Sequence, residues 1–268
     1  MSLLSGETAV ITGAASGNGR AIAEAFADHG AAVVVADLQR EPRQGGTPTD
    51  ELIEERGGEA VFVECDVTDY DDCVAAVEAA DEFGGIDVMV NNAGIVGPQT
   101  PLVDLDLEAY RSLIEVNLDG VFHGAKAAAL ELVERGDGGS IINMSSVAGM
   151  VGYGGITPYS AAKGGVRLFS YALASELGPD GIRVNAIHPG VIETAMTIED
   201  SPTVGTDEGE QLKATIPLRR FGEPSDVAGV CVFLASDLSA YVTAESVVID
   251  GGNQIGRASC RERVYCEV

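Results

Sequence analysis

The segment YSAAKGG contains a tyrosine and a lysine whose spacing could support proton transfer. Tyr159 and Lys163 are four positions apart, so on a helix their side chains lie on the same face. An ammonium group beside a phenol favours the phenolate and lowers the phenol pKa, which makes a tyrosine usable as an acid or base near neutral pH. The chain has only three lysines, at positions 126, 163 and 213. Chance can produce the same spacing, so the interpretation depends on other motifs.

The glycine-rich stretch TGAASGNG indicates a nucleotide-binding turn. Gly13, Gly17 and Gly19 follow an apolar run and open a helical pattern, where backbone amides can approach a pyrophosphate. Asp37 closes the second apolar run. A carboxylate there can accept hydrogen bonds from the adenosine ribose and would repel a 2′-phosphate. The pattern predicts NAD in preference to NADP, with a helix or turn cap as the alternative role for Asp37.

Apolar runs and helical patterns alternate along the chain, and these elements must position the chemical groups. We expect strands at residues 8–12, 31–37, 60–66, 86–94, 140–146, 182–190 and 245–252. We expect helices at about residues 19–29, 49–57, from 68 or 69, 107–135, 158–177 and 224–235, with a loop at 39–50. Uniformly apolar strands separated by helices predict an α/β fold: a single doubly wound Rossmann-type domain with a seven-stranded parallel sheet and helices on both faces.

The polar residues that could bind a ligand follow the predicted strands. In a doubly wound sheet, ligands bind beyond the carboxyl ends of the strands. Six residues at those ends are therefore expected to meet at one crevice: Gly13, Asp37, Asp66, Asn92, Ser146 and Pro189. The domain is predicted to cover residues 1–254.

Several of these motifs together resemble the short-chain dehydrogenase/reductase family, in its classical subgroup. TGAASGNG, NNAG at 91–94, Asn117, the second serine of NMSS, Tyr159-x-x-x-Lys163 and HPG at 188–190 occur in the order and spacing of that family, over about residues 5–253. The resemblance implies that Tyr159 is the general acid/base. Lys163 would hold the nicotinamide ribose and lower the tyrosine pKa, Ser146 would bind the substrate oxygen, with Ser145 as second choice, and Asn117 would position a water.

The resemblance also implies a cofactor-binding set. Its members are Gly13, Ser16, Gly17, Asn18, Gly19, Asp37, Asp66, Val67, Asn92, Ala93, Gly94, Tyr159, Lys163, Pro189, Gly190, Ile192 and Thr194. Asp66 and Val67 would contact adenine, and Ile192 and Thr194 would fix the carboxamide. Asn18 departs from the family, which usually has isoleucine or leucine beside the nicotinamide.

The formal net charge of −26, with 42 acidic residues, is unusual for an enzyme of 268 residues. Such a surface disfavours nucleic acid and anionic membranes as partners, because phosphates are repelled. It is typical of a halophilic protein, whose activity and stability rise in molar salt; a moderately acidic mesophilic enzyme is the alternative. No secretory signal or membrane-spanning run is apparent, so we expect a cytoplasmic protein in a high-salt cytosol.

The cysteines and histidines show no metal-ligand spacing, so no metal site is predicted. Cys65, Cys73 and Cys231 are expected to be small buried residues. Cys260 and Cys266 belong to an arginine-rich terminal segment, residues 255–268, which is interpreted as a foreign, frame-shifted or disordered tail. A natural arm at a subunit interface is the alternative.

The leading function is an NAD-dependent alcohol dehydrogenase or ketoreductase that acts on a small-molecule alcohol or ketone. The alternatives are an NADP-dependent 3-oxoacyl thioester reductase and a non-catalytic NAD-binding sensor or scaffold. Residues 194–221 are expected to close over the substrate, and Val96, Gln99 and Tyr153 could line its pocket. The sequence leaves the substrate open. Family members are commonly tetramers, and the apolar helices at 107–135 and 158–177 suggest a homotetramer.

Overall fold

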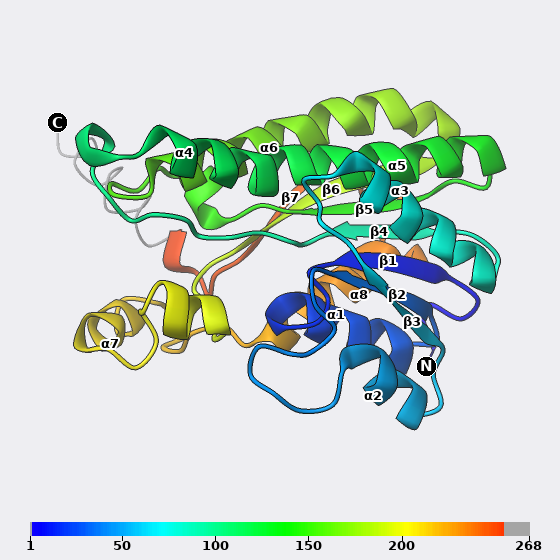
Figure 1. The fold of residues 1–268 in the computed structure, drawn as a ribbon, viewed down its shortest axis with the longest axis horizontal. Coiled ribbons are helices and arrows are strands. Elements are labelled where there is room, and N and C mark those ends of the chain that lie inside the picture. The colour runs from blue at the N-terminus through cyan, green and yellow to red at the C-terminus, as the bar shows by residue number, and fades with distance from the viewer. Residues whose placement is uncertain (1, 255–268) are drawn as a thin grey trace, which may run out of the picture.

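The computed structural model describes residues 2–254, and their strands form one parallel sheet (Figure 1). The strand order is β3-β2-β1-β4-β5-β6-β7. The strands are β1 (Thr8–Thr12), β2 (Ala32–Asp37), β3 (Ala60–Glu64), β4 (Val88–Asn91), β5 (Gly139–Met144), β6 (Ile182–Pro189) and β7 (Ser246–Ile249). The predicted Rossmann-type architecture is confirmed. The order reverses between β1 and β4, and this places a topological switch point at the middle of the sheet.

Helices cover both faces of the sheet (Figure 1). They are α1 (Gly17–Asp28), α2 (Thr49–Glu55), α3 (Tyr70–Glu78), α4 (Leu107–Ile114), α5 (Gly120–Arg135), α6 (Thr157–Leu177), α7 (Asp207–Lys213) and α8 (Pro224–Ala235). Short 3-10 turns are η1 (Ala79–Phe83), η2 (Leu102–Asp104), η4 (Val147–Gly149), η5 (Gly178–Asp180) and η7 (Asp237–Ser239). Helices α1, α2 and α8 pack on one face, and α3, α5 and α6 pack on the other.

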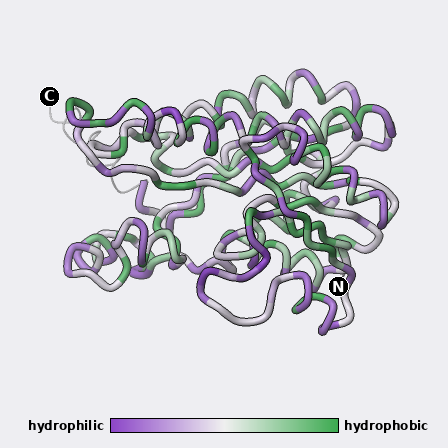
Figure 2. Tube along the Cα trace, viewed as in Figure 1, coloured by the Kyte–Doolittle hydropathy of each residue, from purple (hydrophilic) through white to green (hydrophobic). Residues whose placement is uncertain are grey.

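Alternating residues of the central strands feed two separate cores. In β2, Val33 and Val35 join the core beneath α1 and α8, whereas Val34 and Ala36 join the core beneath α3 and α5. Because both sheet faces are covered, the interior positions of such a strand are apolar whichever face they point to. Figure 2 shows hydrophobic colour along the central strands. The buried cysteines Cys65, Cys73 and Cys231 are free thiols within this packing, as expected.

The helix predicted at residues 107–135 is interrupted. The structure has α4, then a π-helical turn, η3 (Glu115–Asp119), and then α5. The apolar pattern continues through the interruption, and for that reason the sequence predicted one helix. Such π turns often occur at functional sites, and Asn117 lies in this one.

The segment after β6 contains helical structure that was not predicted. Residues 194–221, which we call the substrate-loop segment, include a π-helical turn, η6 (Met196–Asp200), and helix α7. Thr206 caps α7 by accepting a hydrogen bond from the Gly209 amide. Within residues 2–254, no helix is both long and apolar enough to cross a membrane. The terminal segment interpreted as a tail, with Cys260 and Cys266, lies outside the described residues.

Candidate active site

The glycine-rich turn connects β1 to α1 and forms one wall of the site. Gly13 and Gly17 have φ angles of 66° and 56°, a left-handed conformation that favours glycine. A Cβ atom on Gly19 would overlap the carbonyl oxygen of Gly13 and lie 2.6 Å from Nδ2 of Asn92. The chain therefore turns tightly here, and its backbone amides at the start of α1 remain accessible to an anion.

Two side chains join the ends of β1 and β4 at the switch point. The Thr12 hydroxyl accepts hydrogen bonds from the backbone amides of Asn92 at 3.0 Å and Ala93 at 3.1 Å. The Asn92 side chain donates to the Thr12 carbonyl at 2.8 Å. These bonds hold the NNAG segment beside the glycine-rich turn.

Asp37 at the end of β2 faces the same turn. Its carboxylate accepts a hydrogen bond from the Ala15 backbone amide at 2.9 Å. Burial raises the pKa of Asp37, and hydrogen bonds from the backbone of Ala15, Gln39 and Leu38 act in the opposite direction. A carboxylate is thus placed at the site where an adenosine ribose is expected.

Asn117 is fixed by the irregular backbone of η3. Its Nδ2 donates to the carbonyls of Ile95 at 2.9 Å and Leu113 at 3.1 Å, and its Oδ1 accepts from the Ile95 amide at 3.2 Å. In a regular helix the Leu113 carbonyl would bind the backbone amide of Asn117. The side chain satisfies that carbonyl in the π turn and ties the helix to the loop after β4.

Lys163 and Tyr159 come from α6 and reach the same place. Lys163 is only 3% exposed, and its Nζ donates to the Met144 carbonyl at 2.9 Å. Nζ lies 5.8 Å from the centroid of the Tyr159 ring. A Cβ atom on Gly94 would lie 2.7 Å from Oδ1 of Asn117 and 3.4 Å from Nζ of Lys163, so these two groups converge on Gly94.

The two adjacent serines have different partners. The hydroxyl of Ser146 is close enough to the Tyr159 phenol to oppose the rise of its pKa, and it accepts a hydrogen bond from the Ala148 amide at 3.1 Å. The hydroxyl of Ser145 is buried and donates to the Lys163 carbonyl at 2.7 Å. Ser146 is therefore the serine that acts on the pKa of the tyrosine. The buried ring of His188 contacts the Ser146 carbonyl at 3.0 Å and holds this loop in place.

The expected lowering of the Tyr159 pKa by Lys163 is wrong for this structure. Burial raises the pKa of Tyr159, and the hydrogen bond with Ser146 opposes that rise. Burial also lowers the pKa of Lys163 to about 8. The physical reason is that enclosure disfavours the charged form of both groups. Sequence spacing shows which groups are neighbours but not how far each is removed from water.

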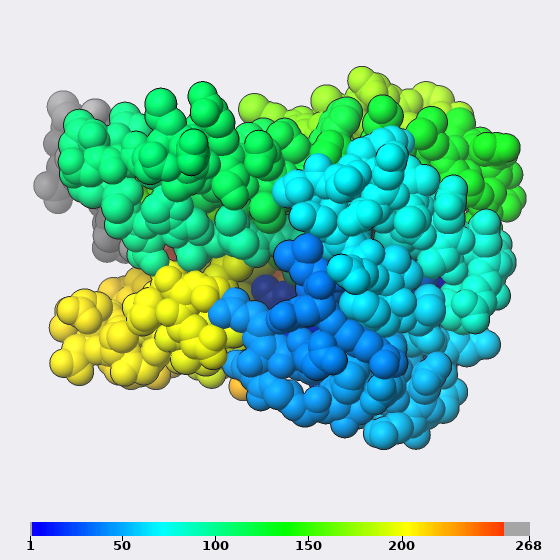
Figure 3. Space-filling view, viewed as in Figure 1, coloured from blue at the N-terminus to red at the C-terminus, as the bar shows by residue number. Residues whose placement is uncertain are grey.

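One cavity of about 480 Å³ collects these groups. Every predicted catalytic and cofactor-binding residue lines it except Gly19, which lies inside the turn. Figure 3 shows a hollow between the green upper part of the molecule and the substrate-loop segment (yellow), at the place where this segment meets the blue residues. Lining residues that the sequence did not single out include Leu38, Gln39, Arg43, Ile95, Val116 and Met144. These residues lie next to predicted motifs or on loops. Neither the spacing of apolar residues nor a motif distinguishes them in the sequence. Val96, Gln99 and Tyr153 are not among the lining residues.

The cavity fits an extended dinucleotide. Its volume is in the ordinary range for cofactor sites. A carboxylate lies at one part of its wall, a glycine-rich helix start at another, and a tyrosine–serine pair at a third. Gly13, Gly17 and Gly94 have no side chain, so they allow close approach of a ligand to the backbone.

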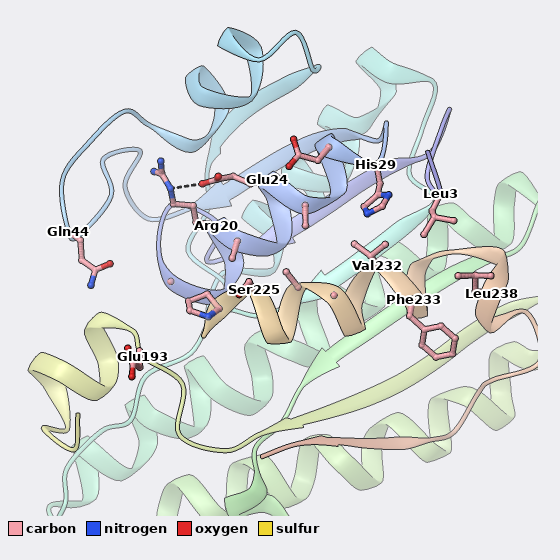
Figure 4. Close-up of a pocket in the computed structure, with 17 residues that line it drawn as sticks. Leu3, Arg20, Glu24, His29, Gln44, Glu193, Ser225, Val232, Phe233 and Leu238 are labelled. Carbon is pink, nitrogen blue, oxygen red and sulfur yellow. Dashed lines mark hydrogen bonds and ion pairs between the residues drawn. The ribbon is translucent and has the colours of Figure 1, made fainter. Parts of the chain in front are cut away.

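A second cavity of about 730 Å³ lies between α1 and α8 (Figure 4). Its rim includes the Arg20–Glu24 ion pair, at 2.9 Å, and Glu193. It shares Gly17 with the first cavity but contains none of the predicted catalytic residues. Among residues 2–254, no cluster of three or more histidine, cysteine or acidic side chains could hold a metal ion.

Comparison with known proteins gives the family. Residues 13–254 match the family model described as "Enoyl-(Acyl carrier protein) reductase". An uncharacterized oxidoreductase of Mycobacterium bovis is 46% identical over 257 residues, which are 95% of this chain and 99% of that protein. The L-rhamnose 1-dehydrogenase (NAD(P)(+)) of Azotobacter vinelandii is 41% identical over 252 residues, 93% of this chain and 97% of that protein.

A solved structure agrees with this assignment. Carveol dehydrogenase from Mycobacterium avium, in complex with NAD, superposes with a TM-score of 0.88 at 32% identity, covering 95% of this chain and 100% of that one. The chain therefore belongs to the short-chain dehydrogenase/reductase family, as the motifs indicated. It is an oxidoreductase that acts on CH–OH groups with a nicotinamide cofactor.

Proposed function

We propose that this protein is an NAD-dependent dehydrogenase that interconverts a secondary alcohol and a ketone, with Tyr159 as general acid/base. The observation that carries the proposal is that Tyr159 and Ser146 line the same cavity as Asn117 and Lys163. A non-catalytic NAD-binding protein has no physical need for all four groups.

In the proposed reaction, the Tyr159 hydroxyl gives a proton to a carbonyl oxygen, or takes one from an alcohol. The Ser146 hydroxyl donates a hydrogen bond to the same oxygen, where negative charge develops. A bound nicotinamide supplies or accepts the hydride. Because burial raises the pKa of Tyr159, alcohol oxidation is favoured by high pH and carbonyl reduction by low pH.

Lys163 and Asn117 would assist proton transfer at Tyr159. With a pKa lowered to about 8, Lys163 can exchange a proton near neutral pH, and its ammonium would hold the nicotinamide ribose. Asn117 would position a water that links Lys163 to solvent. The convergence of both side chains on Gly94 supports this arrangement.

Asp37 supports NAD as the preferred cofactor. The buried carboxylate would accept hydrogen bonds from the adenosine ribose and repel a 2′-phosphate. Other proposed cofactor contacts are Asp66 and Val67 at the adenine and Ile192 and Thr194 at the carboxamide. The named relatives act on L-rhamnose and carveol, which supports a small hydroxyl-bearing substrate.

A spectrophotometric screen of secondary alcohols tests the proposed function. We expect reduction of NAD in molar KCl, with kcat/KM for NADP lower by at least roughly tenfold, since like charges in contact cost several kcal/mol. The net charge predicts higher activity in molar KCl than in dilute buffer. Preferred reduction of 3-oxoacyl thioesters with NADPH would support the thioester reductase instead. NADH binding without turnover of any substrate would support the sensor.

We also propose a cytoplasmic homotetramer in a high-salt cell. Exposed apolar side chains lie on three neighbouring helices, namely Leu107 on α4, Phe122, Leu130 and Val133 on α5, and Leu168 on α6. Exposed apolar side chains gathered on neighbouring helices are typical of a subunit interface. We expect sizing chromatography in molar KCl to give a mass near four subunits. A monomer under these conditions would contradict the homotetramer.

A further inference from the structure

Arg43 joins two segments that are far apart in the sequence. Its guanidinium donates to both carboxylate oxygens of Asp200, at 2.7 and 2.8 Å, and to Glu199 at 3.1 Å. Arg43 belongs to the loop between β2 and α2, and the two acidic residues belong to the substrate-loop segment. We call this set of three ion-paired residues the Arg43 clasp.

The Arg43 clasp lies at the cofactor cavity. Arg43 lines that cavity, and so do Met196 and Thr197, which belong to the same π-helical turn as the acidic pair. The Arg43 backbone amide donates to the Ser16 hydroxyl at 2.8 Å, which connects the clasp to the glycine-rich turn. In Figure 3 the blue loop and the yellow segment meet beside the hollow. A ligand bound in this cavity therefore lies next to the bridge between the two segments.

The geometry of the clasp is favourable for an exposed ion pair. The side chains of Arg43 and Asp200 are 38% and 37% exposed, so a simple pair would contribute little. Two parallel bonds from one guanidinium to one carboxylate are stronger and more directional than a single contact. The hydrogen bond with Arg43 lowers the pKa of Asp200, so this carboxylate stays ionised in the neutral range.

The side-chain hydrogen bonds of Thr197, in the substrate-loop segment, stay within residues 192–197. The Thr197 hydroxyl donates to the Ile192 carbonyl at 2.6 Å and accepts from the Thr194 amide at 3.1 Å. These bonds shape the segment but do not attach it to the loop after β2. Arg43 makes that attachment through three charged hydrogen bonds.

We propose that Arg43 is a positioning residue: the Arg43 clasp holds the substrate-loop segment against the glycine-rich turn and so slows release of the bound dinucleotide. The inference rests on the proposed function, because it assumes that the cavity binds NAD. Separation of the two segments would require these bonds to break, which adds to the barrier for cofactor release.

The release rate of NADH tests the clasp directly. The chain has no tryptophan, so NADH emission can be followed without interference in stopped-flow displacement by excess NAD. We expect Arg43→Gln and Asp200→Asn each to release NADH roughly fivefold faster than the unsubstituted protein. The matched control is Arg56→Gln, because Arg56 pairs with Glu24 at 3.0 Å and does not line the cavity. Its release rate should be unchanged.

A charge exchange distinguishes the clasp from a general effect of substitution. Arg43→Asp combined with Asp200→Arg should restore slow release, whereas each change alone should not. All variants are compared at a KCl concentration at which circular dichroism shows them folded. Unchanged release rates in both single variants, or failure of the exchange to slow release, would overturn the clasp. Absence of NADH binding by the unsubstituted protein would instead contradict the proposed function.

Discussion

Replacing Tyr159 with phenylalanine is expected to lower kcat by about 10²–10⁴-fold, the usual contribution of a positioned acid/base group. The phenol is the proposed proton donor and acceptor, and Tyr159 lines the cavity together with Ser146. The ring remains in the variant, so packing in α6 is retained and NADH should bind nearly as tightly. Turnover and NADH affinity, measured together, check the prediction.

The matched control for this experiment is Tyr171→Phe on the same helix. The Tyr171 hydroxyl contacts Ser246 at 2.6 Å and Arg167 at 2.9 Å, and Tyr171 does not line the cavity. The control should keep its turnover even if it loses some stability. In the unsubstituted enzyme, oxidation should accelerate as pH rises, because the base form of Tyr159 becomes more populated. Intact turnover in Tyr159→Phe would remove the basis of the proposed mechanism.

Replacing Lys163 with methionine is expected to abolish most activity and yet stabilise the fold. Burial lowers the pKa of Lys163 from its ordinary 10.5 to about 8. That shift corresponds to about 3 kcal/mol of destabilisation by the buried charge. Methionine has a similar shape and no charge, but it leaves the Met144 carbonyl without its Lys163 bond, at a cost of roughly 1 kcal/mol. The free energy of unfolding should therefore rise by roughly 2 kcal/mol at neutral pH.

The stability gained by Lys163→Met depends on pH, because the pKa of Lys163 is lower in the folded state than in the unfolded state. Below pH 8, Lys163 is charged in both the folded and unfolded states, so its full penalty is present. Between about 8 and 10.5 the unfolded state binds more protons, so the unsubstituted protein gains stability as pH rises. The difference in the free energy of unfolding between Lys163→Met and the unsubstituted protein should decrease over that pH range. Denaturant unfolding at several pH values measures it, with Lys126→Met as control, since Lys126 is exposed. A destabilised Lys163→Met protein at neutral pH would contradict the prediction.

The sheet and the composition of the site could be predicted from the sequence because both depend on local patterns. Uniformly apolar runs such as Val33–Val35 reflect burial on two faces, and strand-end residues meet in any doubly wound sheet. The π turn at Asn117 could not be predicted, since the apolar pattern of a helix continues across one inserted residue. Helix α7 was missed because its short polar sequence resembles a loop.

The pKa values of the site and the ion pairs between distant segments could not be predicted from the sequence. The Tyr159–Lys163 spacing suggested a lowered tyrosine pKa, but the degree of enclosure decides the direction, and it raises this pKa. Arg43 gave no signal, because its partners Glu199 and Asp200 are distant in the chain and carboxylates are abundant throughout. A contact of this kind depends on how two loops approach each other, which no local pattern records.

The central place of β1 has a consequence for synthesis on the ribosome. Strand β1 pairs with β2 on one side and β4 on the other, so a nascent chain that ends before residue 88 has one flank of its first strand unpaired. Open strand flanks promote self-association between incomplete copies. The dense negative charge of the polypeptide would keep such copies apart by mutual repulsion until β4 closes the gap.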